Sequence, residues 1–171
     1  MRNFHHDQQG FTLAEVITVI SIMSILMTIA MPMMITWYRN ASLQAASRDL
    51  YSSIKLTQAN AARRNQICAI SFDDGDGYVA YVDTNRNFKQ DAGEPELASQ
   101  RWRSYISVSI GAGGVNFPVN ADNKPTLAFR PNSLPASNLG LPNGSVILQS
   151  ATGRSLQVRS SISGNVTISR I

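Results

Sequence analysis

A long apolar run follows a polar stretch near the start of the chain. Residues 11–35 hold one charged side chain, Glu15. A helix over this run, rising about 1.5 Å per residue, would cross the roughly 30 Å hydrocarbon core of a bilayer. Trp37 and Tyr38 follow at once, as expected for aromatic side chains at a membrane interface. The pattern therefore predicts a transmembrane helix.

Beyond this run the apolar positions recur with a helical period. At 100° per residue four of them fall on one narrow face, namely Leu43, Leu50, Ile54 and Ala61. The charged side chains of Arg48 and Lys55 lie far round from that face. Residues 36–66 are therefore predicted to continue the membrane helix as an amphipathic helix that packs on a globular domain.

From residue 67 onward, short β-branched or alternating segments are separated by turn residues. The strand-like segments are "CAISF", "YVAYVD", "RWRSYISVSI", "TLAF", "SVILQS", "SLQVRS" and "NVTISRI". The stretch "FDDGDGYV" is typical of a hairpin. Because strands and helices do not alternate and no repeat occurs, we expect an α+β fold, in which a long N-terminal helix packs on an antiparallel β-sheet formed by residues 67–171.

Composition and charge narrow the class of protein. The 171 residues suit one domain plus an appendage. A net charge of +4 and a pI of about 9.6 permit an anionic partner, but they fall short of a basic nucleic-acid tail. Cys68 is the only cysteine, which excludes an intramolecular disulfide, and we expect it to be a small buried hydrophobe.

A secretory signal peptide is the alternative interpretation of the apolar run, with cleavage after Ala30. The run is longer than the usual apolar region of about 7–15 residues, and Pro32 would then stand near the new N-terminus. We therefore favour a membrane helix. Arg2 is the only basic residue before it, so charge bias gives weak support for a cytoplasmic N-terminus.

Glu15 is the unusual residue of this segment. A charge in the middle of a membrane helix costs about 2.5–3.5 kcal/mol on insertion scales, and such residues normally have a partner. No Lys or Arg occurs in residues 11–35. A position near the headgroups and the positive end of the helix dipole would explain why Glu15 is tolerated. It would not explain the abrupt change from polar to apolar sequence at Gly10.

The stretch "GFTLAEVITVI" resembles the cleavage and methylation motif of type IV pilins and type II secretion pseudopilins. The resemblance implies that prepilin peptidase removes residues 1–10 as a leader, cutting between Gly10 and Phe11, and that Phe11 is then N-methylated. It also implies that Glu15 pairs with the N-terminal amine of a neighbouring subunit during assembly. Pro32 matches a proline at which helices of the family often kink.

Looser resemblance extends over most of the chain and is closest to minor pseudopilins of the GspH/FimT type. It rests on "VDTNRNFKQDAGEPEL", "LAFRPNSLP" and "GRSLQVRSSISGNVTISRI". It implies a minor pilin that assembles with other pilins into a type IV pilus and helps to initiate or cap it. The alternative is a minor pseudopilin of a type II secretion system. In both cases the protein would be a single-pass protein of the inner membrane, in contact with its lipid, with a periplasmic globular domain.

One loop raises the possibility of a calcium site. Oxygen-bearing side chains occupy positions 1, 3, 5, 9 and 12 of an EF-hand-like loop, namely Asp83, Asn85, Asn87, Asp91 and Glu94. Position 6 is Phe88 where such loops need Gly, and the preceding residues resemble a strand. We favour a strand-connecting loop whose side chains bond their own backbone, with no cofactor.

The sequence offers little for catalysis. His5 and His6 lie in the predicted leader, and Cys68 has no base to activate it. The carboxylates Asp73, Asp74 and Asp76 belong to a predicted turn. The methionines of the apolar run are expected to pack against lipid or neighbouring helices, namely Met27, Met31, Met33 and Met34. We therefore predict that the protein is not an enzyme.

DNA binding is a third possibility, because some FimT-like pilins use a C-terminal G-R-x-R motif in DNA uptake. The aligned residues here are Gly164, Asn165, Val166 and Thr167, which lack both arginines. The remaining candidate cations are Arg154, Arg159 and Arg170, with Arg101 and Arg103 in "RWR". Because duplex binding needs clustered cations, we favour a solvated strand face and do not expect nucleic acid to be a partner.

Overall fold

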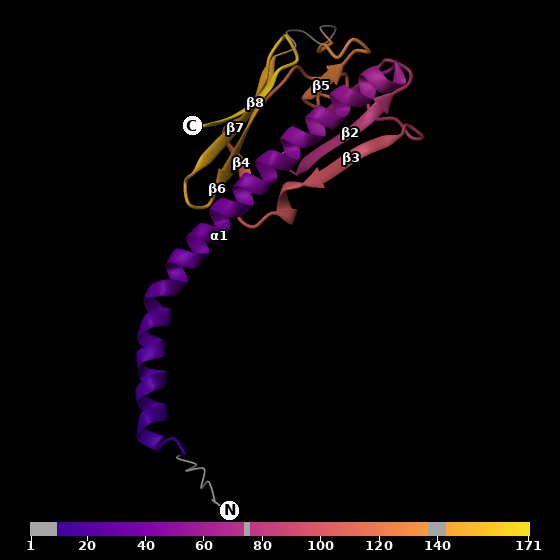
Figure 1. Cartoon of the computed structure of the whole chain (residues 1–171). Helices are drawn as coiled ribbons and strands as arrows, with labels where there is room; N and C mark the ends of the chain where they lie inside the picture. Colours follow the sequence, from indigo (N-terminus) through magenta and orange to yellow (C-terminus); the bar gives the residue numbers. More distant parts are fainter. Residues whose placement is uncertain (1–9, 74–75, 137–142) are drawn as a thin grey trace, which may run out of the picture. The chain divides into compact units, whose positions relative to one another are not determined.

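The computed structural model describes residues 10–73, 76–136 and 143–171. They form one long helix and eight strands (Figure 1). The elements are α1 (Leu13–Arg64), β1 (Ile67–Asp73), β2 (Gly77–Asp83), β3 (Glu96–Arg101), the 3₁₀ helix η1 (Trp102–Ser104), β4 (Val108–Asn116), β5 (Thr126–Phe129), β6 (Gly144–Ser150), β7 (Ser155–Ser160) and β8 (Val166–Arg170). The chain divides into two units, Met1–Trp37 and Tyr38–Ile171.

The part of α1 in the first unit, residues 13–37, is apolar, and no other part of the described chain covers its side chains. It is long and apolar enough to cross a membrane. Five hydroxyl groups along it each donate a hydrogen bond of 2.7–3.0 Å to the carbonyl four residues earlier, those of Thr18, Ser21, Ser24, Thr28 and Thr36. Because these donors are satisfied within the helix, they add little cost to its burial in hydrocarbon.

Pro32 lies inside α1, and the helix continues through it. Proline has no backbone N–H, so the carbonyl of Thr28 loses its usual partner at this point. The kink expected at Pro32 stays a prediction.

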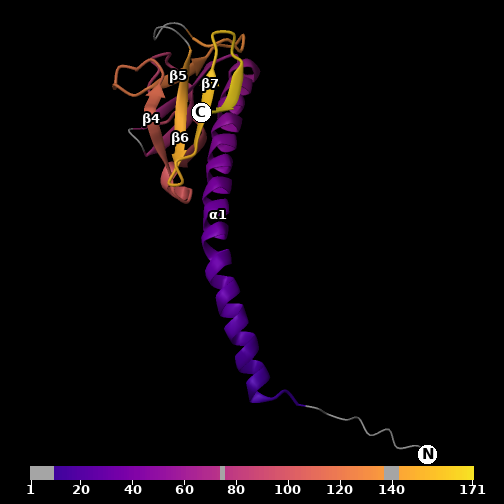
Figure 2. The same cartoon turned by 90° about the vertical axis from the view of Figure 1, so that its left-hand side faces the viewer.

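In the second unit, one face of α1 is buried against the β-domain. The predicted face is confirmed, because Leu43, Leu50, Ile54 and Ala61 are all fully buried. The antiparallel α+β architecture is also confirmed, but the expectation of a single sheet was wrong. There are two four-stranded sheets, ordered β3-β2-β1-β5 and β4-β6-β7-β8 (Figures 1 and 2). The helix face and both sheets contribute to one hydrophobic core.

The segment "RWRSYISVSI", expected to be one strand, is where the chain passes between the sheets. Arg101 ends β3, η1 follows, and β4 begins at Val108. Trp102 is only 1% exposed and packs on Tyr78 with ring centroids 5.3 Å apart. Burial of this large side chain in the core overrides the local strand preference. β3 itself was missed because "ELASQR" is a polar edge strand without an apolar pattern.

The predicted hairpin at "FDDGDGYV" is confirmed by the antiparallel pairing of β1 and β2, with Asp73 opposite Gly77. A Cβ atom at Gly77 would collide with the carbonyl of Gln100 on β3, so this position requires glycine. Asp73 and Asp76 pair with Lys124 and Arg103 at 3.0 and 3.3 Å. Asp74 lies outside the described residues.

Candidate functional site

The first turn of α1 contains Glu15 in a reciprocal hydrogen-bonded cap. Its Oε2 accepts bonds of 2.8 Å from both the backbone N–H and the hydroxyl of Thr12. The Thr12 hydroxyl in turn accepts a bond of 3.3 Å from the Glu15 N–H. This is a capping box, in which a Thr at the N-cap and a Glu three residues later satisfy backbone N–H groups that the helix itself leaves free.

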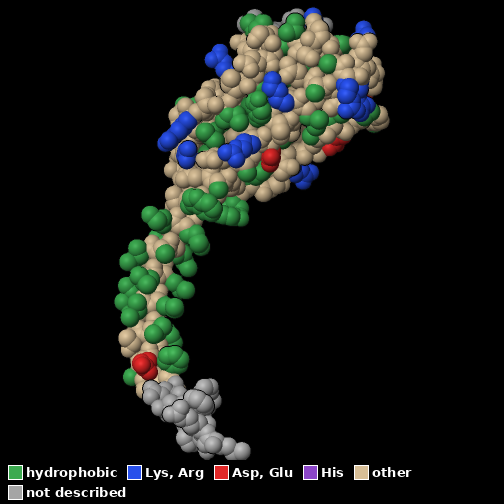
Figure 3. Space-filling model, viewed as in Figure 1, with side chains coloured by type: hydrophobic (Ala, Val, Ile, Leu, Met, Phe, Trp, Pro, Cys, Tyr) green, Lys and Arg blue, Asp and Glu red, His purple; other side chains and the backbone are tan. Residues whose placement is uncertain are grey.

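The capping box gives Glu15 a local partner that our interpretation of the sequence missed. The signal was present as Thr-x-x-Glu in "FTLAE". The cap uses one carboxylate oxygen and leaves the charge unpaired. The ion pairs found among the described residues do not include Glu15. In Figure 3 an acidic group stands near the start of an otherwise apolar stretch.

The predicted cleavage point lies just before this cap. Gly10 and Phe11 precede the helix, and the Phe11 side chain is 88% exposed. The peptide bond between them is therefore outside the helical hydrogen-bond ladder, where a peptidase can bind it in an extended form. Cleavage there would place a new amine four residues from Glu15.

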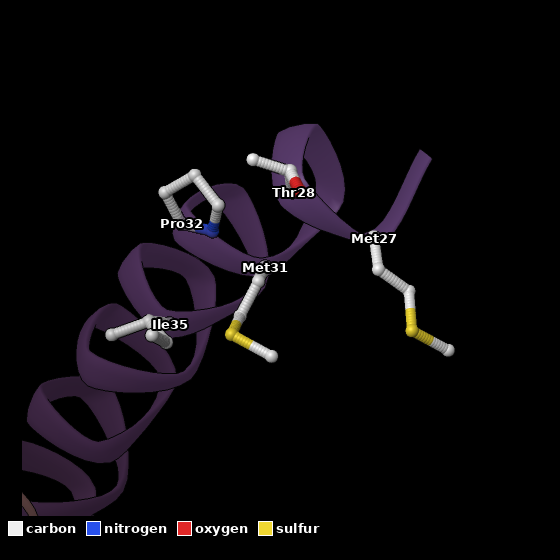
Figure 4. A pocket seen from close by; sticks show the side chains of 5 residues that line it. All are labelled: Met27, Thr28, Met31, Pro32 and Ile35. Atoms are coloured by element: carbon white, nitrogen blue, oxygen red, sulfur yellow. The ribbon is translucent and has the colours of Figure 1, made fainter. Parts of the chain in front are cut away.

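Further along the apolar half of α1, an open depression surrounds Pro32. It is lined by Met27, Thr28, Met31, Pro32 and Ile35 (Figure 4). The two methionine side chains extend to the same side of the helix, away from the proline ring. Flexible thioether side chains of this kind adapt to irregular apolar surfaces, so the depression suits a lipid chain or a neighbouring helix.

The loop after β2 is organised around the buried carboxylate of Asp83. That carboxylate accepts the backbone N–H groups of Asn87 and Phe88 at 3.1 and 2.9 Å. Burial raises the pKa of Asp83, while these hydrogen bonds act in the opposite direction. Phe88 adopts a φ of 61°, the conformation that Gly provides in EF-hand loops, and its ring packs in a small cluster with Tyr81.

The other predicted calcium ligands bond one another or the nearby backbone. Asp91 accepts the side-chain amides of Asn85 and Asn87 at 2.8 and 2.6 Å, and these bonds lower its pKa. Glu94 accepts the N–H and hydroxyl of Thr84 at 2.7 and 3.0 Å. In the described part of the chain, no cluster of three or more His, Cys, Asp or Glu residues could hold a metal. That this loop bonds its own groups and holds no calcium stays a prediction.

The arginines suggested for DNA do not form a single group. On β7, Arg159 pairs with Thr167 and is exposed, while Leu156 pairs with Arg170. Since strand residues alternate between faces, Arg159 lies on the opposite face of the sheet from Arg170. Figure 3 shows Lys and Arg side chains distributed over the β-domain.

The remaining DNA candidates are also separated. Arg103, in η1, pairs with Asp76, in the turn between β1 and β2, and Arg101 is the last residue of β3. Gly164, the first residue of the aligned motif, lies in the turn before β8 with a φ of 78°. That nucleic acid is not a partner stays a prediction.

Cys68 is a free thiol in the hydrophobic core. Burial raises its pKa to about 11, so it is a protonated, unreactive side chain at neutral pH. This is the environment expected for a small core hydrophobe.

Comparison with protein families gives two matches. Residues 46–165 match the family described as type II transport protein GspH. Residues 5–31 match the prokaryotic N-terminal methylation motif. The second match spans the predicted cleavage point, the capping box and most of the apolar run.

Individual relatives agree with these families. The pilin-like protein PilA1 of Thermus thermophilus is 32% identical over 89 residues, which cover 51% of this chain and 56% of that protein. The chain thus spans about half the length of this curated relative. Two crystal structures of the type IV minor pilin FimU of Pseudomonas aeruginosa match with TM-scores of 0.54 and 0.53 at 12% and 13% identity. They cover 78% and 74% of this chain and 92% of FimU, which establishes a shared fold.

Proposed function

The chain belongs to the GspH family of pilin-like type II transport proteins, and on this premise we propose that it is a minor pilin of a type IV pilus. The family is one of structural subunits that assemble with other pilins. Within the fibre, this chain would help to initiate or cap the assembly. Prepilin peptidase would first cut between Gly10 and Phe11, and Phe11 would be N-methylated.

The observation that supports this proposal is the lone charge at the start of an exposed apolar helix. The capping box satisfies hydrogen bonds of Glu15, but its charge has no cationic partner among the residues that the structure describes. After cleavage, the N-terminal amine of Phe11 in a neighbouring subunit carries the opposite charge to Glu15. Pairing the two inside a bundle of apolar helices would lower the cost of holding the carboxylate in hydrocarbon.

The apolar half of α1 anchors the protein in a membrane, as its motif and composition indicate. We further propose that this is the inner membrane, with the processed N-terminus cytoplasmic and the β-domain periplasmic. The β-domain would then provide the surface that other minor pilins contact.

A pseudopilus of a type II secretion system is the second candidate. The description of the matching family, a type II transport protein, favours it. The two candidates differ in the subunits that accompany the chain. Fibres sheared from cells and analysed by mass spectrometry would contain this chain together with type IV pilins in the first case and with secretion pseudopilins in the second.

Processing is tested by mass spectrometry of the membrane-extracted protein. Loss of residues 1–10 together with one added methyl group on Phe11 is the expected result. Cleavage after Ala30 would instead establish a signal peptide and overturn the proposal.

The role of the charge is tested with three variants of the capping box. Glu15→Gln keeps an acceptor for the Thr12 N–H and removes the charge, whereas Thr12→Ala removes the N-cap hydroxyl and keeps the charge. Loss of an N-cap typically costs about 1 kcal/mol. If the charge drives assembly, Glu15→Gln and Glu15→Ala should both lose incorporation into fibres at least tenfold, while Thr12→Ala should be incorporated nearly as well as wild type. Normal incorporation of Glu15→Gln would leave only the capping role.

A further inference from the structure

A groove runs between α1 and the second sheet, within the unit formed by Tyr38–Ile171. Its lining residues are Gln44, Ser47 and Arg48 of α1 and Arg154, Leu156 and Ile168 of the sheet. Figures 1 and 2 both show β7 and β8 beside α1.

The floor of the groove is formed by apolar residues of β7 and β8, which are buried to different extents. Val158 of β7 is fully buried, whereas Ile168, opposite it on β8 and on the same face, is 39% exposed. Leu156 continues the apolar surface along β7. An apolar side chain placed on Ile168 would extend the core by one further row.

Two guanidinium groups line the same groove, and neither has an acidic partner in the described part of the chain. Arg154 is half-buried, and its Nε is shielded from solvent and makes no hydrogen bond. The ion pairs found among the described residues include neither Arg48 nor Arg154. A guanidinium N–H that is shielded from water and has no acceptor costs free energy. A carboxylate can remove that cost, because it forms two parallel hydrogen bonds with the planar guanidinium.

We propose that this groove receives a carboxylate-bearing segment of a neighbouring pilin-type subunit. The carboxylate lies between Arg48 and Arg154, and an adjacent apolar side chain of the segment packs on Leu156 and Ile168. The proposal rests on the function proposed above, since it assumes that pilin-type subunits surround the chain in a fibre.

A protein segment fits this groove better than a nucleic-acid backbone. Duplex DNA binding draws on a row of cations that follow the phosphates. Here two cations flank an apolar floor, and Arg159 lies on the opposite face of the sheet. Mixed apolar and charged contacts of this kind are typical of interfaces between proteins.

Site-specific photo-crosslinking of the full chain in cells tests the proposal. A crosslinking amino acid at Gln44 lies in the groove, and one at Ser169 lies on the outer face of β8 as a matched control. We expect Gln44 to crosslink to another pilin-type subunit, with the attachment mapped by mass spectrometry to a segment that contains Asp or Glu. Ser169 should give no crosslink to that segment.

Charge variants then test the arginines. The double variant Arg48→Ala/Arg154→Ala should reduce the Gln44 crosslink at least tenfold, whereas Arg159→Ala, an arginine on the other face, should leave it unchanged. Arg154→Lys, which retains the charge, controls for folding and should lose less. Arg154→Glu alone should weaken the Gln44 crosslink. Changing the mapped acid of the partner to Lys in the same cells should restore it, because the pair then has opposite charges again.

Several results would overturn the proposal. They are a Gln44 crosslink that survives the double variant, a mapped segment without a carboxylate, and crosslinking to DNA in place of protein. Absence of a Gln44 crosslink from chains that are processed and present in fibres would reject the groove and leave the proposed function intact. Absence of the wild-type chain from all fibres would reject both.

Discussion

The two halves of α1 have the same secondary structure and opposite surroundings. In residues 13–37 the large apolar side chains are exposed, whereas in residues 38–64 the apolar face is buried against two sheets. The second half therefore obtains its hydrophobic stabilisation within the chain. The first half can obtain it only from lipid or from neighbouring subunits.

The largest expected difference between the halves is in the effect of shortening an apolar side chain. Leu50→Ala should lower the free energy of unfolding of the β-domain by about 2–5 kcal/mol, because it leaves a cavity in the shared core. Ile22→Ala, in the exposed half, should leave that free energy unchanged. Urea unfolding of the full chain in detergent, followed by tryptophan fluorescence, measures both. Similar losses for the two variants would mean that the halves do not differ in this way.

A smaller effect is expected from the thiol that packs in the same core as Leu50. Burial raises the pKa of Cys68 from 9.0 to about 11, so the folded state holds this proton more tightly than the unfolded state. The stabilisation is complete below pH 9 and is lost as pH rises through about 11, in total about 3 kcal/mol for two pKa units at about 1.4 kcal/mol each.

Unfolding curves measured between pH 8 and 11 test this expectation. Wild type and Cys68→Ala are compared at each pH, because buried tyrosines titrate in both proteins and their contribution cancels. The difference in stability between the two should shrink as pH rises. A difference that is constant with pH would show that the thiol is not shielded in this way.

The smallest expected effect concerns the loop after β2, whose carboxylates accept hydrogen bonds from groups of the same loop. Addition of calcium or of a chelator should leave the melting temperature of the full chain in detergent unchanged, because Asp91 and Glu94 already accept hydrogen bonds from neighbouring groups. A calcium-dependent increase that Asp91→Asn abolishes would establish a metal site. Lys89→Ala is a suitable control, since it changes the loop without removing a predicted ligand.

The sequence determined those features that depend on residues close together in the chain. The apolar run, the buried face of the second half of α1, the β1–β2 hairpin and the methylation motif all have local patterns. The capping box at Thr12 and Glu15 also had a local signal, although we first interpreted Glu15 through its charge alone. Such features follow from helix period, strand alternation and hydrogen bonds between neighbours.

Only the tertiary structure decided how the strands divide between two sheets, where β3 forms and which residues line the groove beside α1. The burial of Trp102 interrupts a segment with strong strand character, and edge strand β3 forms from polar residues because β2 is there to pair with it. The groove with Arg48 and Arg154 joins residues more than 100 positions apart. No local pattern encodes such a contact, because it depends on how far the helix extends over the sheet.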